Sequence, residues 1–217
     1  MFNFAPQFIM EKDKKKHILE TAEELFAQKG FEAATVRDIA DAANVNLAMI
    51  SYYFGSKEKL MEDLFHQRMD SMKLKMELLL KNEVLTPFQK VENLIEEYIK
   101  KVINRQSFYK ILLCEQVMKK NPVIVKLVRE LKMNYAALFS ELIKEGQKKK
   151  VFKKNIDIVM ALTTMTGTVT QMMVNKDYYA EFNGHTGLSE DDLKKLLSEK
   201  LNAHLKTVFK SILGYES

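Results

Sequence analysis

Glycine and proline are scarce in this chain, with seven glycines and three prolines among 217 residues. Both residue types interrupt regular structure, and the many tight turns of a β fold would require more of them. Nearly half of the residues are apolar, which is enough to bury a substantial core. The sequence therefore predicts an all-α protein, with about nine helices.

Three short segments near the N-terminus carry apolar residues at helical spacing. The first covers residues 12–29 and ends at Gly30. Thr35, with Asp38 three residues later, is typical of the cap of a second helix, and Asn46 can cap a third. Three helices of this size, the last two joined by a tight turn, predict a helix-turn-helix that places its third helix in the major groove of DNA.

The third helix is expected to have an inner side, with Ile50 and Phe54, and an outer side. The side chains then available to DNA are Leu47, Ala48, Ser51, Tyr52 and Tyr53. Leu47 and Ala48 could contact thymine methyl groups, whereas Ser51 and Tyr52 could reach phosphates. Tyr53 is expected to be the more packed of the two tyrosines.

Residues 13–60 resemble the DNA-binding head of the tetracycline-repressor (TetR) family of bacterial transcription regulators. The matching residues are Ala22, Leu25, Phe26, Gly30, Thr35, Val36, Ile39, Ala40, Ala43, Val45, Tyr52, Phe54, Lys57 and Leu60. The rest of the chain matches only as the all-helical body that such a head carries. The resemblance implies a ligand-responsive repressor that binds a palindromic operator as a homodimer, without enzyme activity and without a cofactor.

The resemblance also implies roles for individual residues. It makes Thr35, Tyr52 and Lys57 contacts to phosphate, and Arg37 a contact to a base edge or a nearby phosphate. The groove-facing start of the third helix is then the run Asn46, Leu47, Ala48 and Met49.

Two positions depart from the family pattern. Asn44 stands where glycine is common, but asparagine tolerates a positive φ angle better than most residues. Leu47 stands where polar or basic residues are frequent. Base reading is therefore expected to depend on methyl contacts and on Arg37.

Plainer explanations exist for some of these residues. A compact helical corner with two core tyrosines would explain Tyr52 and Tyr53 without DNA. The basic run at residues 12–16 is typical of a solvated helix start, and the alternative is an arm that reaches a minor groove. Residues 1–11 are predicted to be a disordered arm and not a signal peptide, because they lack a basic leader and a cleavage site.

The head is predicted to cover residues 12–56 and the body residues 57–217. Body helices are expected at about 57–81, from Thr86 onward, at 107–118, from Pro122 to about Gly146, at 155–176 and after Ser189. The segment 177–189, DYYAEFNGHTGLS, is predicted to be a loop.

A single head would bind DNA weakly, so the body is expected to supply a dimer interface. The last two helices are the candidates, because the first has small residues that allow close approach and the second has an apolar stripe. The predicted interface residues are Thr163, Thr166, Gly167, Thr170, Leu197, Leu201, Leu205 and Phe209. The alternative is that both stripes belong to the core of one chain.

Residues 57–148 are rich in methionine and aromatic side chains, which suit an adaptable apolar pocket and also plain core. The residues predicted to bind a ligand are Phe65, Met69, Met72, Tyr98, Phe108, Cys114, Met118, Tyr135 and Phe139. The family resemblance implies that an apolar or amphipathic effector in the body respaces the two heads and releases DNA.

The net charge of +5 is not concentrated in the head, because residues 1–60 contain eight Lys or Arg against nine Asp or Glu. DNA binding must therefore rest on where particular cations lie. The single cysteine, Cys114, excludes an internal disulfide and suits a reducing cytoplasm. No apolar run reaches the roughly 18 residues that a membrane span needs, so no membrane partner is expected.

Motifs for catalysis or metal binding do not occur in the sequence. Its four histidines lie in different segments, and no pair has the spacing of metal ligands. The rival interpretations are a helical ligand-binding protein without DNA function and a small helical enzyme. The sequence identifies neither the effector nor the operator.

Overall fold

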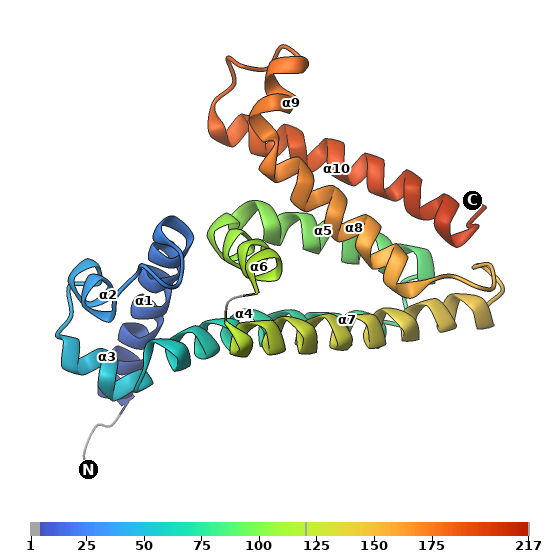
Figure 1. The fold of residues 1–217 in the computed structure, drawn as a ribbon. Helices are drawn as coiled ribbons and strands as arrows, with labels where there is room; N and C mark the ends of the chain where they lie inside the picture. The colour runs from blue at the N-terminus through green and yellow to red at the C-terminus, as the bar shows by residue number, and fades with distance from the viewer. Residues whose placement is uncertain (1–4, 120, 217) are drawn as a thin grey trace. The chain divides into compact units, whose positions relative to one another are not determined.

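The computed structural model describes residues 5–119 and 121–216, and of these the side chains of residues 5–12 and 69–73 are outside the description. Over this part of the chain the fold is all-α, as predicted, with ten helices (Figure 1). They are α1 (Ala5–Lys29), α2 (Val36–Ala42), α3 (Leu47–Phe54), α4 (Lys57–Leu80), α5 (Pro87–Asn104), α6 (Gln106–Met118), α7 (Pro122–Lys148), α8 (Ile158–Val174), α9 (Lys176–Phe182) and α10 (Glu190–Leu213). In the described residues, no helix is both long and apolar enough to span a bilayer.

The chain divides into two compact units. The head unit consists of residues 1–71 and 107–131, and the body unit of residues 72–106 and 132–217. This division differs from the predicted boundary at residue 56, because the first part of α4, almost all of α6 and the start of α7 belong to the head unit.

An aromatic contact explains why α6 belongs to the head unit. The rings of Phe65 on α4 and Phe108 on α6 meet edge to face, with centroids 5.1 Å apart, and both side chains are buried. They extend the apolar cluster that Ile18, Ile39 and Ile50 form between the first three helices. Such a contact between distant segments leaves no signal in local periodicity.

The N-terminal boundary also differs from the prediction. Helix α1 begins at Ala5, so residues 5–11 are helical and the predicted disordered arm is wrong for them. Proline at the second helical position is compatible with this start, since its missing N–H has no partner in the first turn of a helix. The remaining residues of the predicted arm, 1–4, lie outside the described residues.

The body unit is built on α5, α8 and α10, which pack against one another (Figure 1). The apolar stripe of α10 faces this packing. The four stripe residues that were predicted to form a dimer interface are each at most 1% exposed: Leu197, Leu201, Leu205 and Phe209. The prediction that these four residues form a dimer interface is therefore wrong. They are core of a single chain, because α5 and α8 already cover that stripe.

The segment predicted as a loop contains helix α9. Its centre is held by Ala180, which is buried, and its end is closed by a hydrogen bond of 2.7 Å from the His185 N–H to the Ala180 carbonyl. Asn175 precedes the helix but makes no side-chain cap, because its side-chain amide donates to the Gln171 carbonyl of α8 at 3.0 Å. The two tyrosines and the phenylalanine of α9 also have lower intrinsic helix propensity than alanine or leucine.

Gly146, near the end of α7, lies directly against the ring of Phe152 in the following loop. A Cβ atom placed on Gly146 would come within 2.0 Å of Phe152 Cδ2. Phe152 is buried, and its ring centroid lies 6.3 Å from that of Tyr215 near the C-terminus. The absence of a side chain at residue 146 thus allows the loop after α7 to pack.

Replacing Gly146 with alanine is expected to lower the free energy of unfolding by about 1–3 kcal/mol, because the added methyl group must displace a buried ring. Thermal and denaturant unfolding would measure the change. Gly187→Ala is the control, since a Cβ there meets open space. Equal stabilities of the two variants would contradict the packing argument.

Candidate nucleic-acid interface

Helices α2 and α3 form a helix-turn-helix, as predicted, joined by a short turn. In the turn, Asn44 has a φ angle of 51°, a left-handed conformation that asparagine adopts more readily than most residues. Asn46 caps α3, because its Oδ1 accepts a hydrogen bond of 2.9 Å from the N–H of Ala48. The short turn between the two helices is thus shaped by two asparagines, Asn44 through its left-handed backbone and Asn46 through the cap of α3.

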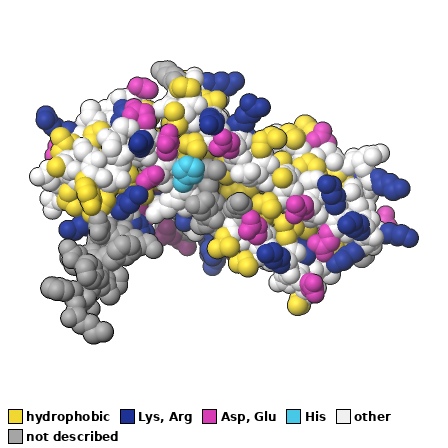
Figure 2. Space-filling model, turned by 90° about the horizontal axis from the view of Figure 1, so that it is seen from below, with side chains coloured by type: hydrophobic (Ala, Val, Ile, Leu, Met, Phe, Trp, Pro, Cys, Tyr) yellow, Lys and Arg dark blue, Asp and Glu magenta, His cyan; other side chains and the backbone are white. Residues whose placement is uncertain are grey.

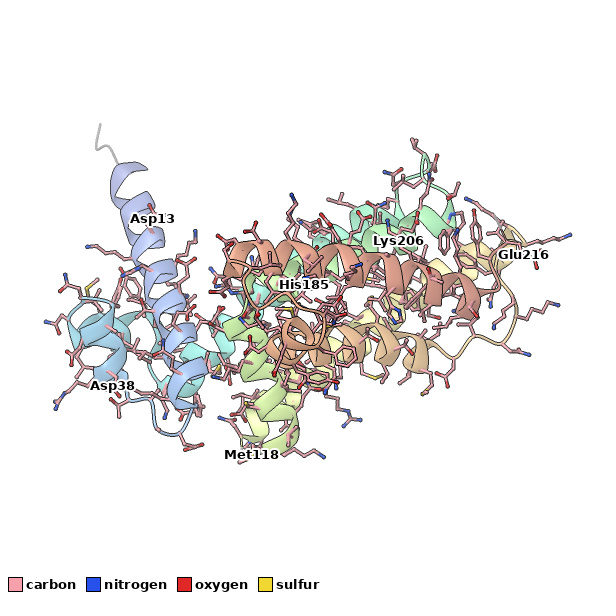
Figure 3. All side chains as sticks on the ribbon, turned by 90° about the horizontal axis from the view of Figure 1, so that it is seen from above. Asp13, Asp38, Met118, His185, Lys206 and Glu216 are labelled. Carbon is pink, nitrogen blue, oxygen red and sulfur yellow. The ribbon has the colours of Figure 1, made fainter. Side chains whose placement is uncertain are left out.

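The start of α2 is fixed by reciprocal hydrogen bonds between Thr35 and Asp38. The Asp38 N–H donates to Thr35 Oγ1 at 3.0 Å, while the N–H and the hydroxyl of Thr35 donate to Asp38 Oδ2 at 2.8 and 2.7 Å. These bonds, with Lys29 at 3.3 Å, lower the pKa of Asp38 to about 2. Figure 3 shows Asp38 in the head unit. The Thr35 side chain therefore serves the cap, and its phosphate contact stays a prediction.

The outer side of α3 is where the sequence predicted it. Exposed side chains on this helix and at its cap are Asn46, Leu47, Ala48, Ser51 and Tyr52. Tyr52 is 76% exposed and Leu47 40% exposed. Met49 and Tyr53 are half-buried, and Arg37 on α2 is exposed. Of the residues predicted to contact DNA from α2 and α3, all are thus exposed except Met49 and Tyr53, which are partly packed.

The two tyrosines of α3 have different environments. Tyr53 packs against the apolar cluster of the head unit, and its ring centroid lies 6.2 Å from that of buried Phe54. The Tyr52 ring meets the edge of Tyr53, with centroids 5.2 Å apart, and otherwise faces solvent. A corner with two core tyrosines is therefore excluded, because only one of them has core contacts.

Lys57, the first residue of α4, has its ammonium group in a cradle of backbone carbonyls. Nζ donates to the carbonyl oxygens of Phe31 at 2.8 Å, Ala34 at 3.2 Å and Glu32 at 3.3 Å. It also lies 4.4 Å from the centroid of the Phe31 ring, a favourable cation–π distance. An ammonium group has three donors, and these three carbonyls can occupy all of them.

This arrangement gives Lys57 a structural role that the sequence reading missed. The cradle ties the segment between α1 and α2 to the start of α4, and so positions the cap at Thr35. The predicted phosphate contact of Lys57 stays a prediction, since a phosphate would have to compete with carbonyls already in place. No pattern in the sequence marks a lysine that binds backbone carbonyls some twenty-five residues away.

A buried ion pair connects α1 to α4 within the head unit. Both Nε and Nη2 of Arg68 lie 2.7 Å from Glu23 Oε2, and Glu23 is only 5% exposed. Removing one partner of such a pair leaves an uncompensated charge in a poorly solvated place. The pair thus fixes how the first helix sits on the first half of α4.

The basic run at residues 12–16 lies inside α1 and has its own acidic partners. Lys15 pairs with Asp63 at 2.8 Å, and Lys16 lies 3.8 Å from Glu20. The run is therefore a solvated part of the helix, as the first alternative supposed, but it lies inside α1 and not at its start. Figure 2 likewise shows basic and acidic side chains interspersed on the visible face, with no single large basic patch.

The residues predicted to bind a ligand are divided between the two units. Phe65 and Phe108 are core of the head unit, and Phe139 is core of the body unit, where its ring lies 6.3 Å from that of Phe209. Cys114 is exposed, and Met118 at the end of α6 is 56% exposed (Figure 3). Three of these five residues are thus core of their own unit and two are exposed, and their contact with a ligand stays a prediction.

The other predicted ligand residues have different outcomes. Tyr98 is buried and lines a cleft of the body unit. Burial raises the pKa of Tyr98 to about 12, and burial also raises that of half-buried Tyr135. Met69 and Met72 lie among the residues whose side chains are outside the description. Within the described residues, no group of three His, Cys, Asp or Glu side chains could hold a metal ion.

Two family models match the chain. Residues 18–64 match the model described as bacterial regulatory proteins, tetR family, and residues 87–200 match the tetracyclin repressor-like, C-terminal domain. The first match covers the helix-turn-helix, and the second covers more than half of the chain. Together they account for both units described above.

Individual relatives agree with these matches. The probable HTH-type transcriptional regulator YttP of Bacillus subtilis is 30% identical over 147 residues, which are 66% of this chain and 69% of YttP. The probable acrEF/envCD operon repressor of Escherichia coli K12 is 28% identical over 165 residues, or 74% of each chain. The structure of the fatty acid degradation regulator FadR from Bacillus halodurans superimposes with a TM-score of 0.66 at 24% identity, over 89% of this chain and 94% of FadR.

The carbonyl cradle of Lys57 predicts a measurable loss of stability. Lys57→Met keeps most of the stem but removes the ammonium group, so the free energy of unfolding should fall by about 1–3 kcal/mol. Lys59→Met, an exposed lysine on the same helix, should change it by less than about 0.5 kcal/mol. A Lys57→Met protein as stable as the wild type would show that the cradle contributes little.

Proposed function

This chain belongs to the TetR family of bacterial regulatory proteins, and we propose that it represses transcription as a homodimer bound to a palindromic operator. Membership in the family makes it a DNA-binding, ligand-responsive regulator of transcription and not an enzyme. The rival interpretation as a helical ligand-binding protein without DNA function is thereby set aside. Repression itself is supported by relatives that are named as repressors, among them the operon repressor of Escherichia coli.

The observation that best supports the operator proposal is the exposed outer side of α3. It offers small and apolar side chains at the start of the helix and the Tyr52 hydroxyl one and a half turns later. In a helix-turn-helix the start of the recognition helix meets base edges, while flanking hydroxyl groups meet phosphates. Leu47 and Ala48 are then positioned for thymine methyl groups, Tyr52 and Ser51 for the backbone, and Arg37 for a phosphate or a guanine edge.

Tight binding requires a second head, because the few phosphate contacts of one head lose affinity steeply as salt is added. Two heads about 34–36 Å apart would reach successive major-groove faces of a palindrome. The outer side of α8 is the surface we propose for dimerisation. It exposes Met160, Thr163, Gly167 and Val174, which recur three, four and seven residues apart along one face.

The proposed interface retains only part of the set predicted from the sequence. Thr163 and Gly167 are exposed and belong to it, whereas Thr166 and Thr170 are half-buried beside it. The hydroxyl of Thr166 donates to the Leu162 carbonyl at 2.9 Å within the same helix. A Cβ on Gly167 would meet open space in the single chain, so this position can receive a second backbone at close range.

The DNA interface is tested with an operator obtained by selecting bound fragments from the native genome. Tyr52→Ala should weaken operator binding about three- to tenfold without loss of stability, because the side chain is exposed. Arg37→Ala should weaken binding and also reduce the slope of log K against log salt by about one. Tyr178→Ala, an exposed tyrosine on α9, is the control. Wild-type affinity in both head variants would refute the proposed contacts.

The dimer interface is tested by Gly167→Glu, which places a charged side chain on the outer side of α8. Sedimentation should show a dimer for the wild type and a shift to monomer for this variant, with its helix content retained. Gly187→Glu adds the same charge at an open loop position and should leave the dimer intact. A Gly167→Glu protein that remains fully dimeric would exclude α8 as the interface.

A further inference from the structure

A cleft of about 330 Å³ opens in the body unit between the second half of α4 and α5. Its walls are of two kinds. The apolar wall includes Met76, Leu79, Leu94 and Tyr98, and the polar wall includes Lys75, Glu97 and Lys101. The cleft is thus amphipathic along its length.

Lys101 has an unusual position in this cleft. Its Nζ is buried and has no hydrogen-bond partner among the described residues. The carboxylate whose charge acts on Lys101, that of Glu97, is already bound to Lys75 Nζ at 2.6 Å. Burial and the neighbouring cations Lys75 and Arg105 lower the pKa of Lys101 to about 8. The polar wall therefore carries more positive charge than its single carboxylate can balance.

The same unit contains a second buried lysine, Lys90, whose ammonium group has the ion pair that burial normally requires. Lys90 is 2% exposed, and its Nζ donates to Glu145 Oε2 at 2.8 Å and to the Leu80 carbonyl at 2.9 Å. A buried ammonium group is costly unless it is paired in this way. Lys101 incurs that cost without the pairing, and it does so on the wall of a cleft that a ligand could enter.

The remaining wall of the cleft suits an apolar chain. Leu94 and Tyr98 are buried at its floor, and Leu78 at its edge is 60% exposed to solvent. An exposed leucine next to a cleft is a surface that a bound hydrocarbon would cover. The cleft therefore combines an apolar floor with one cation that lacks a counter-ion.

We propose that this cleft binds an anionic amphiphile, an apolar chain that ends in a carboxylate or a phosphate, with Lys101 as the counter-ion of the head group. The effector role of this ligand, but not its binding, rests on the proposed function as an operator-binding repressor. A cationic amphiphile would leave the buried ammonium group without a partner, and a neutral one could accept a hydrogen bond but would not balance the charge. Charge, more than chain shape, then selects the effector class.

The binding test compares amphiphiles of one chain length below their micelle concentrations. Decanoate, decyl phosphate, decanol and decyltrimethylammonium are titrated into the full-length protein by calorimetry. At least one of the two anions should bind ten times or more tightly than decanol, and the cation should bind more weakly still. The two anions separate a carboxylate from a phosphate head group. Equal binding of decanol and both anions, or no binding of either anion, would overturn the proposal.

Variants of Lys101 test the residue itself. Lys101→Met should abolish the preference for anions, retain the affinity for decanol and raise the melting temperature of the ligand-free protein, because an unpaired buried charge is removed. Lys101→Arg should keep the preference. Lys100→Met, the preceding exposed lysine, is the matched control and should change none of these values. An unchanged anion preference in Lys101→Met would refute the role of Lys101.

The effector role is read separately from operator binding. The ligand-free protein is first tested for dimerisation and for operator affinity, which concern the proposed function alone. The preferred anion should then lower operator affinity tenfold or more in the wild type and leave it unchanged in Lys101→Met. If operator binding is present and no anion weakens it, the effector role fails while the proposed function stands.

Discussion

Each helix of this protein satisfies most of its backbone hydrogen bonds internally, so contacts between side chains must hold the helices together. Burial of apolar faces supplies most of the stabilisation between helices, but it is not directional. The few polar contacts that cross between helices supply direction. In the head unit they include the Lys57 cradle and the Glu23–Arg68 pair, and in the body unit they include the Lys90–Glu145 pair. Each of these contacts involves a charge that is removed from water. Deleting one partner would leave that charge unpaired and lower the free energy of unfolding.

The DNA-facing part of the head depends on these contacts for its shape. Thr35 and Lys57 were singled out for phosphate binding, yet in the structure one caps α2 and the other holds the segment that leads into it. Tyr52 differs from both, since it is exposed and carries little of the fold. Of the residues predicted to contact DNA, Thr35 and Lys57 thus hold the head in shape, whereas Tyr52 lies on the surface that DNA would meet.

Local features of the head could be read from the sequence because each depends on neighbouring residues. The Thr35–Asp38 cap, the left-handed Asn44 and the inner positions of α3 are of this kind. The apolar stripe of α10 was also recognised, but periodicity says only that a face is buried and not what covers it. The Lys57 cradle and the Phe65–Phe108 contact join residues that are far apart in the sequence, and the burial of the Lys101 ammonium group also depends on tertiary packing. No local pattern predicts any of the three. Helix α9 was missed for the opposite reason, since its local signals are weak.

The chain passes from one unit to the other three times, and two of these passages fall in the middle of α4 and α7. Helix formation is cooperative, so a helix whose residues serve two cores cannot melt in one of them without fraying in the other. Neither unit is therefore a module that can be excised at a loop. A perturbation in one core thus has a continuous helical path to the other.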